Sequence, residues 1–387
     1  MDGHASRIGD PGWDLLRRIS IADPGSAAFD EARALASELP DPDDLLAQAA
    51  RHALVPSLAD FLVQAELLPS MPHHAQRHLL GTLHWNRFKT RRYAIEAARV
   101  TAALADAGVR AACTKGVVCQ ASLYDGRGIR HFGDIDLMVP PEHRDRAAEV
   151  LYRLGYTGAK KFDHRTGELL DISRSLQLMY QLYPDHLPHF FRVPADDDGI
   201  PYFMVDVAYN LTWYGSSWQI LTASALERVV TVNGVPEQDD RAELPSLDTP
   251  YGFLFVVLHL FREGWFERTI REKDVRLGQC ADVWRYWERL GRDRGDEIRN
   301  IITEHFLEPA VAWVCRHVDD VYGSSLTDEL ALGDYCDDGW LHSAGAVDGG
   351  YLVWRGSFSE RLRDRRPLLL EPGSEPPFAA AARVRSV

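Results

Sequence analysis

The sequence has few cysteines, and their arrangement does not indicate a cross-linked or zinc-binding protein. Five occur in 387 residues, an odd number, and no two have C-x-x-C spacing. Disulfide frameworks and structural zinc sites use paired or closely spaced cysteines, so both are disfavoured. The five positions are Cys113, Cys119, Cys280, Cys315 and Cys336. We expect buried thiols in a reducing compartment.

Long apolar runs are also missing. The longest, "YGFLFVVLHLF" from Tyr251, has about half the length that a membrane-spanning helix needs. The first residues, "MDGHASRIGDPGWD", contain no basic stretch followed by an apolar core, so they do not resemble a secretory signal. These absences favour a cytoplasmic protein that has no membrane partner.

The sequence also contains fewer basic than acidic residues. Aspartate and glutamate number 57 against 43 lysines and arginines, which gives a net charge of −14. A field of this sign repels a polyphosphate backbone, so nucleic acid is disfavoured as a partner. A local basic patch can still hold a small anion.

Hydrophobic periodicity divides the chain into four segments. Apolar residues at three- and four-residue spacing predict helical segments over 1–107 and 216–360. Between them, 108–215 mixes helices with strand-like runs, among them "SLQLMYQLY" and "YFMVDVAYNL", whose spacing favours antiparallel pairing. We therefore expect an α/β (α+β) fold with a mixed sheet flanked by helices. The tail, 361–387, contains Pro and Gly punctuation and is predicted to be loosely ordered.

The stretch "RHFGDIDLMV" from Arg130 carries the first chemical signal. Asp134 and Asp136 are two residues apart on a predicted strand, so their side chains point to one face. Two carboxylates this close repel each other unless a cation lies between them. Mg²⁺ typically uses one or two carboxylates together with substrate phosphates. The pair thus indicates either a magnesium site or a solvated strand edge.

Two further features favour the first interpretation. Upstream, Gly116 of "TKG" lies at a strand–helix turn where backbone can approach a phosphate, and Lys115 adds a positive charge. Downstream, "YFMVDVAYNL" buries a lone acid, Asp206, which is costly unless it is paired or metal-bound. A third carboxylate near the pair suits two-metal phosphoryl transfer. An ordinary turn and an Asp–Arg pair remain the alternatives.

Together these residues resemble the polymerase-beta-like nucleotidyltransferase superfamily. Its pattern is a glycine at a strand–helix turn, a D-h-D strand and a lone acid on a later antiparallel strand. The sequence is more similar still to bacterial proteins labelled "nucleotidyltransferase family protein". The shared elements are Lys115-Gly116, Leu123-Tyr124, Arg130, "GDIDLMV" and the "LGY" that begins at Leu154. The resemblance extends from about Leu45 to Leu290.

The resemblance implies a nucleotidyltransferase core over 108–215 and a site for an NTP, expected to be ATP. Asp134, Asp136 and Asp206 would hold Mg²⁺, with Mn²⁺ as the alternative, and a nucleoside monophosphate would pass to a hydroxyl or phosphate with release of pyrophosphate. The acceptor would be a small molecule, a peptide or a macromolecule. The nucleotide would contact Lys115, Gly116, Arg130 and Gly133. The family's helical partner segment carries a histidine, a basic residue and an aspartate, here His259, Arg276 and Asp282.

The sequence departs from the family in two places. Lys-Gly replaces Gly-Gly or Gly-Ser, and Ala208 stands where close relatives often have a histidine. One alternative function is a catalytically inactive nucleotide-binding scaffold or interaction protein, and another is a toxin-type nucleotidyltransferase acting on RNA or protein. A haloacid-dehalogenase phosphatase fits less well because the apolar run follows the aspartates. A histidine metal site at His186 and His189 is not expected from their spacing.

Overall fold

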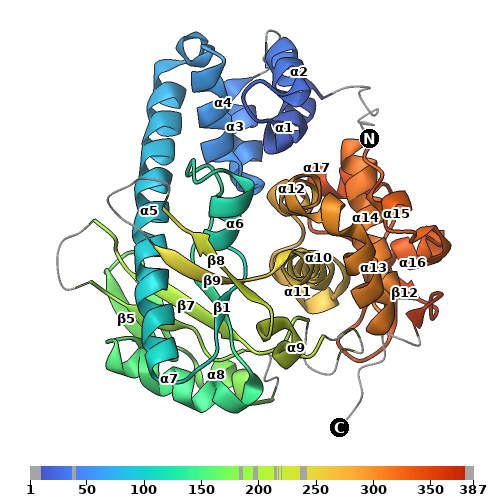
Figure 1. Cartoon of the computed structure of the whole chain (residues 1–387). Helices are drawn as coiled ribbons and strands as arrows, with labels where there is room; N and C mark the ends of the chain where they lie inside the picture. Colours follow the sequence, from blue (N-terminus) through green and yellow to red (C-terminus); the bar gives the residue numbers. More distant parts are fainter. Residues whose placement is uncertain are drawn as a thin grey trace.

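The computed structural model of the chain describes residues 10–36, 41–182, 186–194, 199–212, 216, 218, 220–235 and 242–379. N-terminal helices lead into a mixed sheet with its own helices, and a larger group of C-terminal helices follows (Figure 1). The predicted α+β fold with a mixed sheet between helical segments is confirmed.

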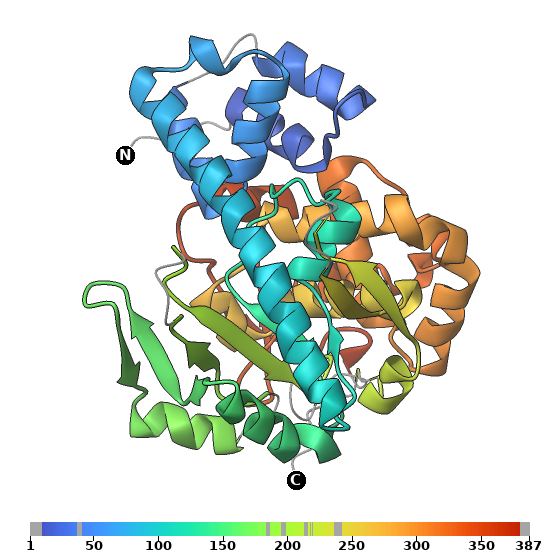
Figure 2. The ribbon, with the colours of Figure 1, turned by 60° about the vertical axis from the view of Figure 1, so that its left-hand side comes forward.

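Two of the N-terminal helices begin after an aspartate whose side chain satisfies free backbone N–H groups. Asp10 accepts hydrogen bonds from the N–H groups of Gly12 and Trp13, and Asp41 accepts one from Asp43. The helices are α1 (Pro11–Ile21), α2 (Ala27–Ala36), α3 (Pro42–Arg51), α4 (Val55–Gln64) and α5 (His73–Asp106). The last of these is 34 residues long and runs from the N-terminal helices across the sheet (Figure 2).

The main sheet of the described chain has the strand order β3-β6-β7-β2-β1-β9-β8. Its strands are β1 (Ala112–Cys113), β2 (Ile135–Met138), β3 (Thr157–Gly158), β6 (Phe190–Arg192), β7 (Phe203–Ala208), β8 (Val229–Asn233) and β9 (Glu243–Leu247). A separate hairpin pairs β4 (Lys160–Asp163) with β5 (Glu168–Asp171). The strands that carry the predicted acids, β2 and β7, are therefore neighbours near the centre of the main sheet.

The strand that carries Asp206 runs in a different direction from the one we expected. β7 is antiparallel to its hairpin partner β6, but it is parallel to β2. Parallel neighbours need a crossover connection, and α7 (Arg144–Arg153) provides it. The register pairs the Cα atom of Asp136 with that of Asp206. Parallel pairing thus places the two acids side by side on adjacent strands.

A second expectation, a strand over "SLQLMYQLY", is wrong. This stretch forms helix α8 (Arg174–Leu182). Its alternating leucines imitate a strand, but it contains no β-branched residue and is rich in Leu, Gln and Met, which are good helix formers. The helix propensity of these residues therefore decided the structure, although the alternating leucines predicted a strand.

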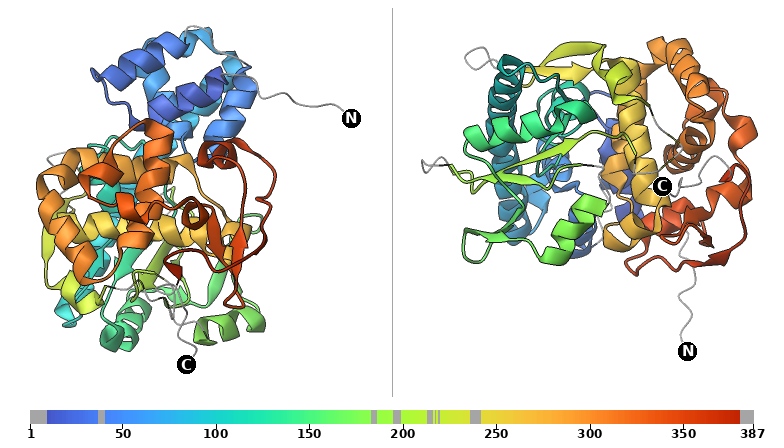
Figure 3. Two further views of the ribbon diagram at one scale, coloured as in Figure 1. Left: turned by 90° about the vertical axis from the view of Figure 1, so that its right-hand side faces the viewer. Right: turned by 90° about the horizontal axis from the view of Figure 1, so that it is seen from below.

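The C-terminal helices pack around α10 (Thr249–Trp265), which is buried along most of its length. Figure 3 shows α10 between the sheet and the outer helices. The others are α11 (Glu267–Glu272), α12 (Leu277–Tyr286), α13 (Gly295–Glu304), α14 (Glu308–Tyr322), α15 (Leu326–Glu329), α16 (Asp338–Leu341) and α17 (Phe358–Arg363), with α9 (Thr222–Leu226) before them. Among the described residues, no helix combines the length and apolar character needed to cross a membrane.

Two large hydrophobic clusters and one small one form the core of the described residues. The smaller of the two large clusters lies between the sheet and helices α5 and α7, and includes Val100, Leu137 and Val150. The larger contains Leu16 and Trp313, so N-terminal and C-terminal helices share it. The five cysteines are free, and all but Cys336 are buried, as expected for small apolar side chains.

The segment predicted to be a loose tail contributes one strand. β12 (Glu371–Gly373) pairs with β11 (Tyr351–Val353), which pairs with β10 (Ser343–Gly345). The end of the chain, 380–387, lies outside the described residues. The segment boundaries drawn from the sequence stay a prediction.

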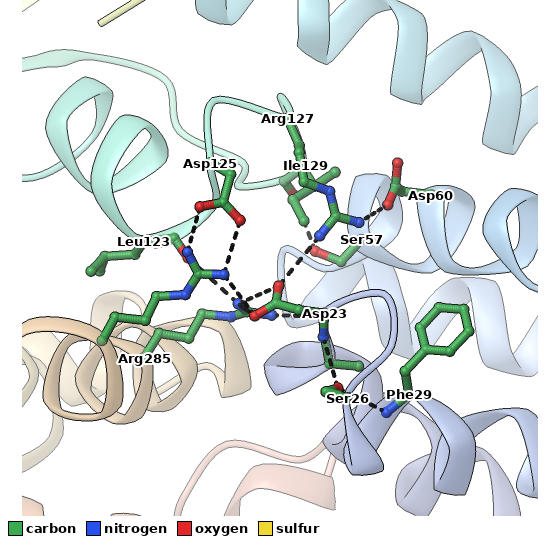
Figure 4. Close-up of polar contacts among 12 residues, drawn as sticks. Asp23, Ser26, Phe29, Ser57, Asp60, Leu123, Asp125, Arg127, Ile129 and Arg285 are labelled. Atoms are coloured by element: carbon green, nitrogen blue, oxygen red, sulfur yellow. Dashed lines mark hydrogen bonds and ion pairs between the residues drawn. The ribbon is translucent and has the colours of Figure 1, made fainter. Parts of the chain in front are cut away.

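A network of ion pairs fixes the loop that leads into β2 (Figure 4). Asp23, after α1, accepts hydrogen bonds from Arg127 in this loop and from Arg285 and Arg289 in the C-terminal helices. Arg127 also pairs with the buried Asp60 of α4. The loop before the "GDID" stretch is therefore held by both helical segments.

Candidate active site

A cavity of about 310 Å³ lies where the N-terminal helices, the sheet and the C-terminal helices meet. The N-terminal helices supply mainly apolar lining, such as Leu54, and the sheet supplies the acidic edge. Its polar and charged lining residues are Ser57, Lys115, Tyr124, Arg130, His131, Asp134, Asp136, His259, Glu263, Lys273, Arg276, Gln279 and Asp282. All three residues of the helical partner segment that the resemblance indicated, His259, Arg276 and Asp282, line this cavity.

Gly116 lets the turn after β1 approach the acidic edge closely. It has a φ of 47° and immediately precedes α6 (Val117–Leu123). A Cβ atom placed on it would lie 3.2 Å from the Asp134 carbonyl oxygen and 3.3 Å from the Asp136 Oδ2. Both the backbone conformation and the space therefore require glycine.

A Gly116→Ala variant is expected to lose at least about 1 kcal/mol of unfolding free energy, because the side chain is strained and crowds Asp136. Gly133→Ala is the matched control, since a Cβ atom there meets nothing within 4 Å. Urea denaturation of both variants measures the difference. Equal stability of the two variants would contradict the proposed fit.

The aspartate pair differs in burial. Asp134 is half-buried just before β2, and Asp136 lies within the strand with 5% of its surface exposed. Asp136 Oδ2 is buried and has no hydrogen-bond partner among the described residues. Burial raises the pKa of Asp136, and the charge of Asp134 raises it further, while Lys115 offsets this in part. A nearby positive charge therefore stabilises the ionised form of the Asp136 carboxylate.

Lys115 supplies some of that charge. Its Nζ lies 2.8 Å from Asp136 Oδ1 and 3.0 Å from His259 Nε2. Burial opposes the charged form of Lys115, but Asp136 and Asp134 outweigh it and raise the lysine pKa. Burial and the neighbouring lysine lower the pKa of His259 to about 3, so its ring is neutral and can accept a hydrogen bond from Lys115. The β1–α6 turn and α10 thus meet at the acidic edge.

Arg130 is engaged by the C-terminal helices. Its Nη2 donates to Asp282 Oδ2 at 2.7 Å, and its Nε lies 3.0 Å from both carboxylate oxygens. The Tyr124 hydroxyl also donates to Asp282, at 2.7 Å. Arg130 Nη1 is buried and has no hydrogen-bond partner in the described structure. Arg130 therefore joins the loop before β2 to α12 and still borders the cavity.

The sequence matches the model of one protein family over residues 38–323, well over half of the chain. That family is described as "Uncharacterised nucleotidyltransferase". The chain belongs to this family. No curated protein matches the sequence.

The matched region of this nucleotidyltransferase contains the whole cavity lining and every residue of the predicted site. The residues at the acidic edge fit a hard divalent cation, because Asp134 and Asp136 offer oxygen ligands and the buried Asp136 Oδ2 is unpaired. Lys115 now partly neutralises the same carboxylate. Asp134 and Asp136 would therefore be the residues that hold Mg²⁺.

The third predicted acid of the nucleotidyltransferase, Asp206, is turned toward two histidines. Its Oδ1 is 3.4 Å from His186 Nδ1, and its Oδ2 is 3.9 Å from His189 Nε2. Asp206 does not line the cavity, although it is paired in register with Asp136. We did not expect these histidines to lie at the site. The only signal in the sequence is that "HLPH" shortly precedes the strand with the third acid.

Two exposed cations stand at the rim of the cavity. Lys273 and Arg276 lie between α11 and α12, and no carboxylate of the described residues forms an ion pair with either. Their positive charge is therefore available to an anion that enters the cavity. Gly133, which precedes Asp134, also lines the cavity. A Cβ atom placed on it would meet nothing within 4 Å, so this position leaves open space.

Proposed function

We propose that this chain transfers a nucleoside monophosphate from an NTP, with ATP as the expected nucleotide, to a hydroxyl or phosphate acceptor. The observation that carries the proposal is the buried, unpaired Oδ2 of Asp136 next to Asp134, at the edge of a cavity that also contains Lys115. A cation and a polyphosphate together supply the charges that this arrangement lacks.

In the proposed reaction the acceptor oxygen attacks the α-phosphorus of the NTP. The bond from that phosphorus to the α–β bridging oxygen breaks, and pyrophosphate leaves with the bond electrons. Asp134 and Asp136 would hold Mg²⁺, and Asp206 would contribute a third carboxylate from β7 and help to take the acceptor proton. When bound, Mg²⁺ neutralises charge that builds up on the phosphate oxygens.

The remaining residues bind and orient. The charge of Lys115, which lines the cavity, and the backbone at the neighbouring Gly116, which does not, would contact the triphosphate. Lys273 and Arg276 would attract anionic groups at the rim. Positioning and charge neutralisation supply most of the rate in such reactions. No side chain needs to form a covalent bond to the nucleotide.

Pyrophosphate release tests the proposal directly. The protein is incubated with each of the four NTPs and Mg²⁺, with cell extract as the source of acceptor, and pyrophosphate is measured. We expect release with one preferred NTP, and no release with EDTA or in an Asp134→Ala variant that keeps its thermal unfolding midpoint. Release that persists in Asp134→Ala would contradict the mechanism.

Calorimetry and labelled ATP separate the alternatives. Nucleotide binding without pyrophosphate release, with any extract fraction, would favour the inactive scaffold. Label recovered in RNA or protein would indicate the toxin-type activity, and label in a small molecule would indicate a metabolic acceptor. Mass spectrometry of the labelled product identifies which acceptor is used.

A further inference from the structure

His186, His189 and Asp206 form a compact group beside the proposed nucleotide site. Each offers one donor atom, and these atoms lie within 4.8 Å of one another. In the described part of the chain, no other group of three or more His, Cys, Asp or Glu side chains meets this criterion. The three side chains are each about one-fifth to one-third exposed, so a small ion can reach them.

The backbone holds this group in register. The Leu187 N–H donates to the Val207 carbonyl oxygen at 2.9 Å, and His186 bridges to Ala208 on β7. The two histidine rings are stacked, with a ring-plane angle of 17° and centroids 5.6 Å apart. The Tyr180 ring of α8 packs edge-on against His186. The histidines are therefore aligned on the same side of Asp206.

The hydrogen bonds leave lone pairs unused. His186 Nδ1 lies 3.0 Å from the Leu187 carbonyl oxygen. A carbonyl oxygen only accepts, so Nδ1 carries the proton in the metal-free protein; the same Nδ1 lies 3.4 Å from Asp206 Oδ1 and would release that proton to bind a metal ion. Asp206 Oδ1 is buried and has no hydrogen-bond partner among the described residues.

From this arrangement we propose that His186, His189 and Asp206 bind a divalent transition-metal ion of the class of Mn²⁺, Co²⁺ or Zn²⁺. Two imidazole nitrogens and one carboxylate are ligands for such ions, whereas Mg²⁺ prefers oxygen alone. The three protein ligands leave coordination positions for water or substrate oxygen. This site is distinct in ligand type from the Asp134–Asp136 edge.

Asp206 can serve both sites. A carboxylate has two oxygens with about four lone-pair positions, so it can bind this ion and still contribute to the Mg²⁺ of the proposed function. The parallel register with Asp136 places it between the two. The transition-metal site itself does not depend on nucleotide transfer, so it is tested without nucleotide.

The test is a Co²⁺ titration of the full chain after removal of metal with EDTA. We expect visible ligand-field absorption that saturates near one equivalent, is displaced by Zn²⁺ and survives millimolar Mg²⁺. In His189→Ala and His186→Gln, Co²⁺ affinity should fall by at least about 100-fold, since each removes one ligand. His164→Gln is the matched control, because His164 is exposed and outside the group.

Thermal unfolding provides a second measurement for the same variants. Zn²⁺ should raise the midpoint of the wild type and of His164→Gln, and should leave His189→Ala unchanged. Co²⁺ absorption that is unaffected by either histidine variant, or that is lost only in Asp134→Ala, would overturn the proposal. A failed pyrophosphate assay would not, because no nucleotide is present in these measurements.

Discussion

An Asp136→Asn variant is expected to lose pyrophosphate release by at least about 10²–10³-fold while becoming no less stable. Asp136 is 5% exposed, and its Oδ2 has no hydrogen-bond partner among the described residues. The negative charge therefore destabilises the metal-free protein and favours binding of a cation. Asparagine keeps the shape and removes the charge. Loss of activity and gain of stability should therefore occur in one variant.

The raised pKa of Asp136 predicts how the unfolding free energy depends on pH, and from this whether the variant gains or loses stability. The folded-state pKa of Asp136 is raised by burial and by Asp134, so the folded protein binds the proton more tightly than the unfolded chain. The stability from this group is full below the ordinary pKa of 3.8 and is lost as the pH rises toward the folded-state value. In the Asp136→Asn variant the unfolding free energy does not decrease in this way as the pH rises. Its unfolding free energy at neutral pH without metal should exceed that of the wild type by on the order of 1 kcal/mol.

Urea denaturation at several pH values, with and without Mg²⁺, measures both effects. Mg²⁺ should raise the stability of the wild type and have little effect on Asp136→Asn. Asp145→Asn, on the exposed surface of α7, is the matched control and should leave activity and stability unchanged. An asparagine variant that is markedly less stable, or retains activity within a few-fold, would show that Asp136 is a structural ion-pair partner of Lys115 instead.

Arg130→Ala is expected to lower the unfolding free energy by about 3–5 kcal/mol, because it leaves a buried carboxylate uncompensated. The Asp282 side chain is 9% exposed and receives two nitrogens of Arg130. Removing the arginine also disconnects β2 from α12. The measurement is made without nucleotide, so that an additional contact of Arg130 with phosphate does not enter the result.

A double-mutant cycle with Asp282→Ala isolates the pair. The double variant should be more stable than the sum of the single effects indicates, because neither charge is then left alone. Arg110→Ala is the matched control. Its guanidinium lies 3.8 Å from Glu142 with both side chains about half exposed, and such a pair contributes about 1 kcal/mol or less. Similar losses in Arg130→Ala and Arg110→Ala would contradict a structural role for the Arg130–Asp282 pair.

The sequence was most informative where the signal is local. The parity of Asp134 and Asp136 and the glycine at the β1–α6 turn follow from the geometry of a few residues, and the structure places both turn and acids at one cavity edge. Asp206 was predicted to be buried within an apolar strand, but its side chain is 23% exposed and faces His186 and His189. Whether these residues bind metal and nucleotide stays a prediction.

Contacts between distant parts of the chain were not readable. Arg130 and Asp282 are 152 residues apart, and nothing near Arg130 in the sequence marks it as the ion-pair partner of Asp282. The direction of β7 depends on the crossover through α7 and β6, and with it the pairing of Asp136 with Asp206. His186 and His189 approach Asp206 because β6 and the segment before it pair antiparallel with β7, and the spacing of these residues along the sequence does not reveal this contact.

The shared hydrophobic core has a consequence for how the chain acquires its structure. Helix α1 is made early, but α12, on which it packs, follows more than 250 residues later. Contacts this distant in sequence form slowly, and the apolar face of α1 that α12 covers remains exposed until α12 has been made. The cavity walls therefore assemble last, and the nascent N-terminal helices are the stage at which aggregation or chaperone binding is most expected.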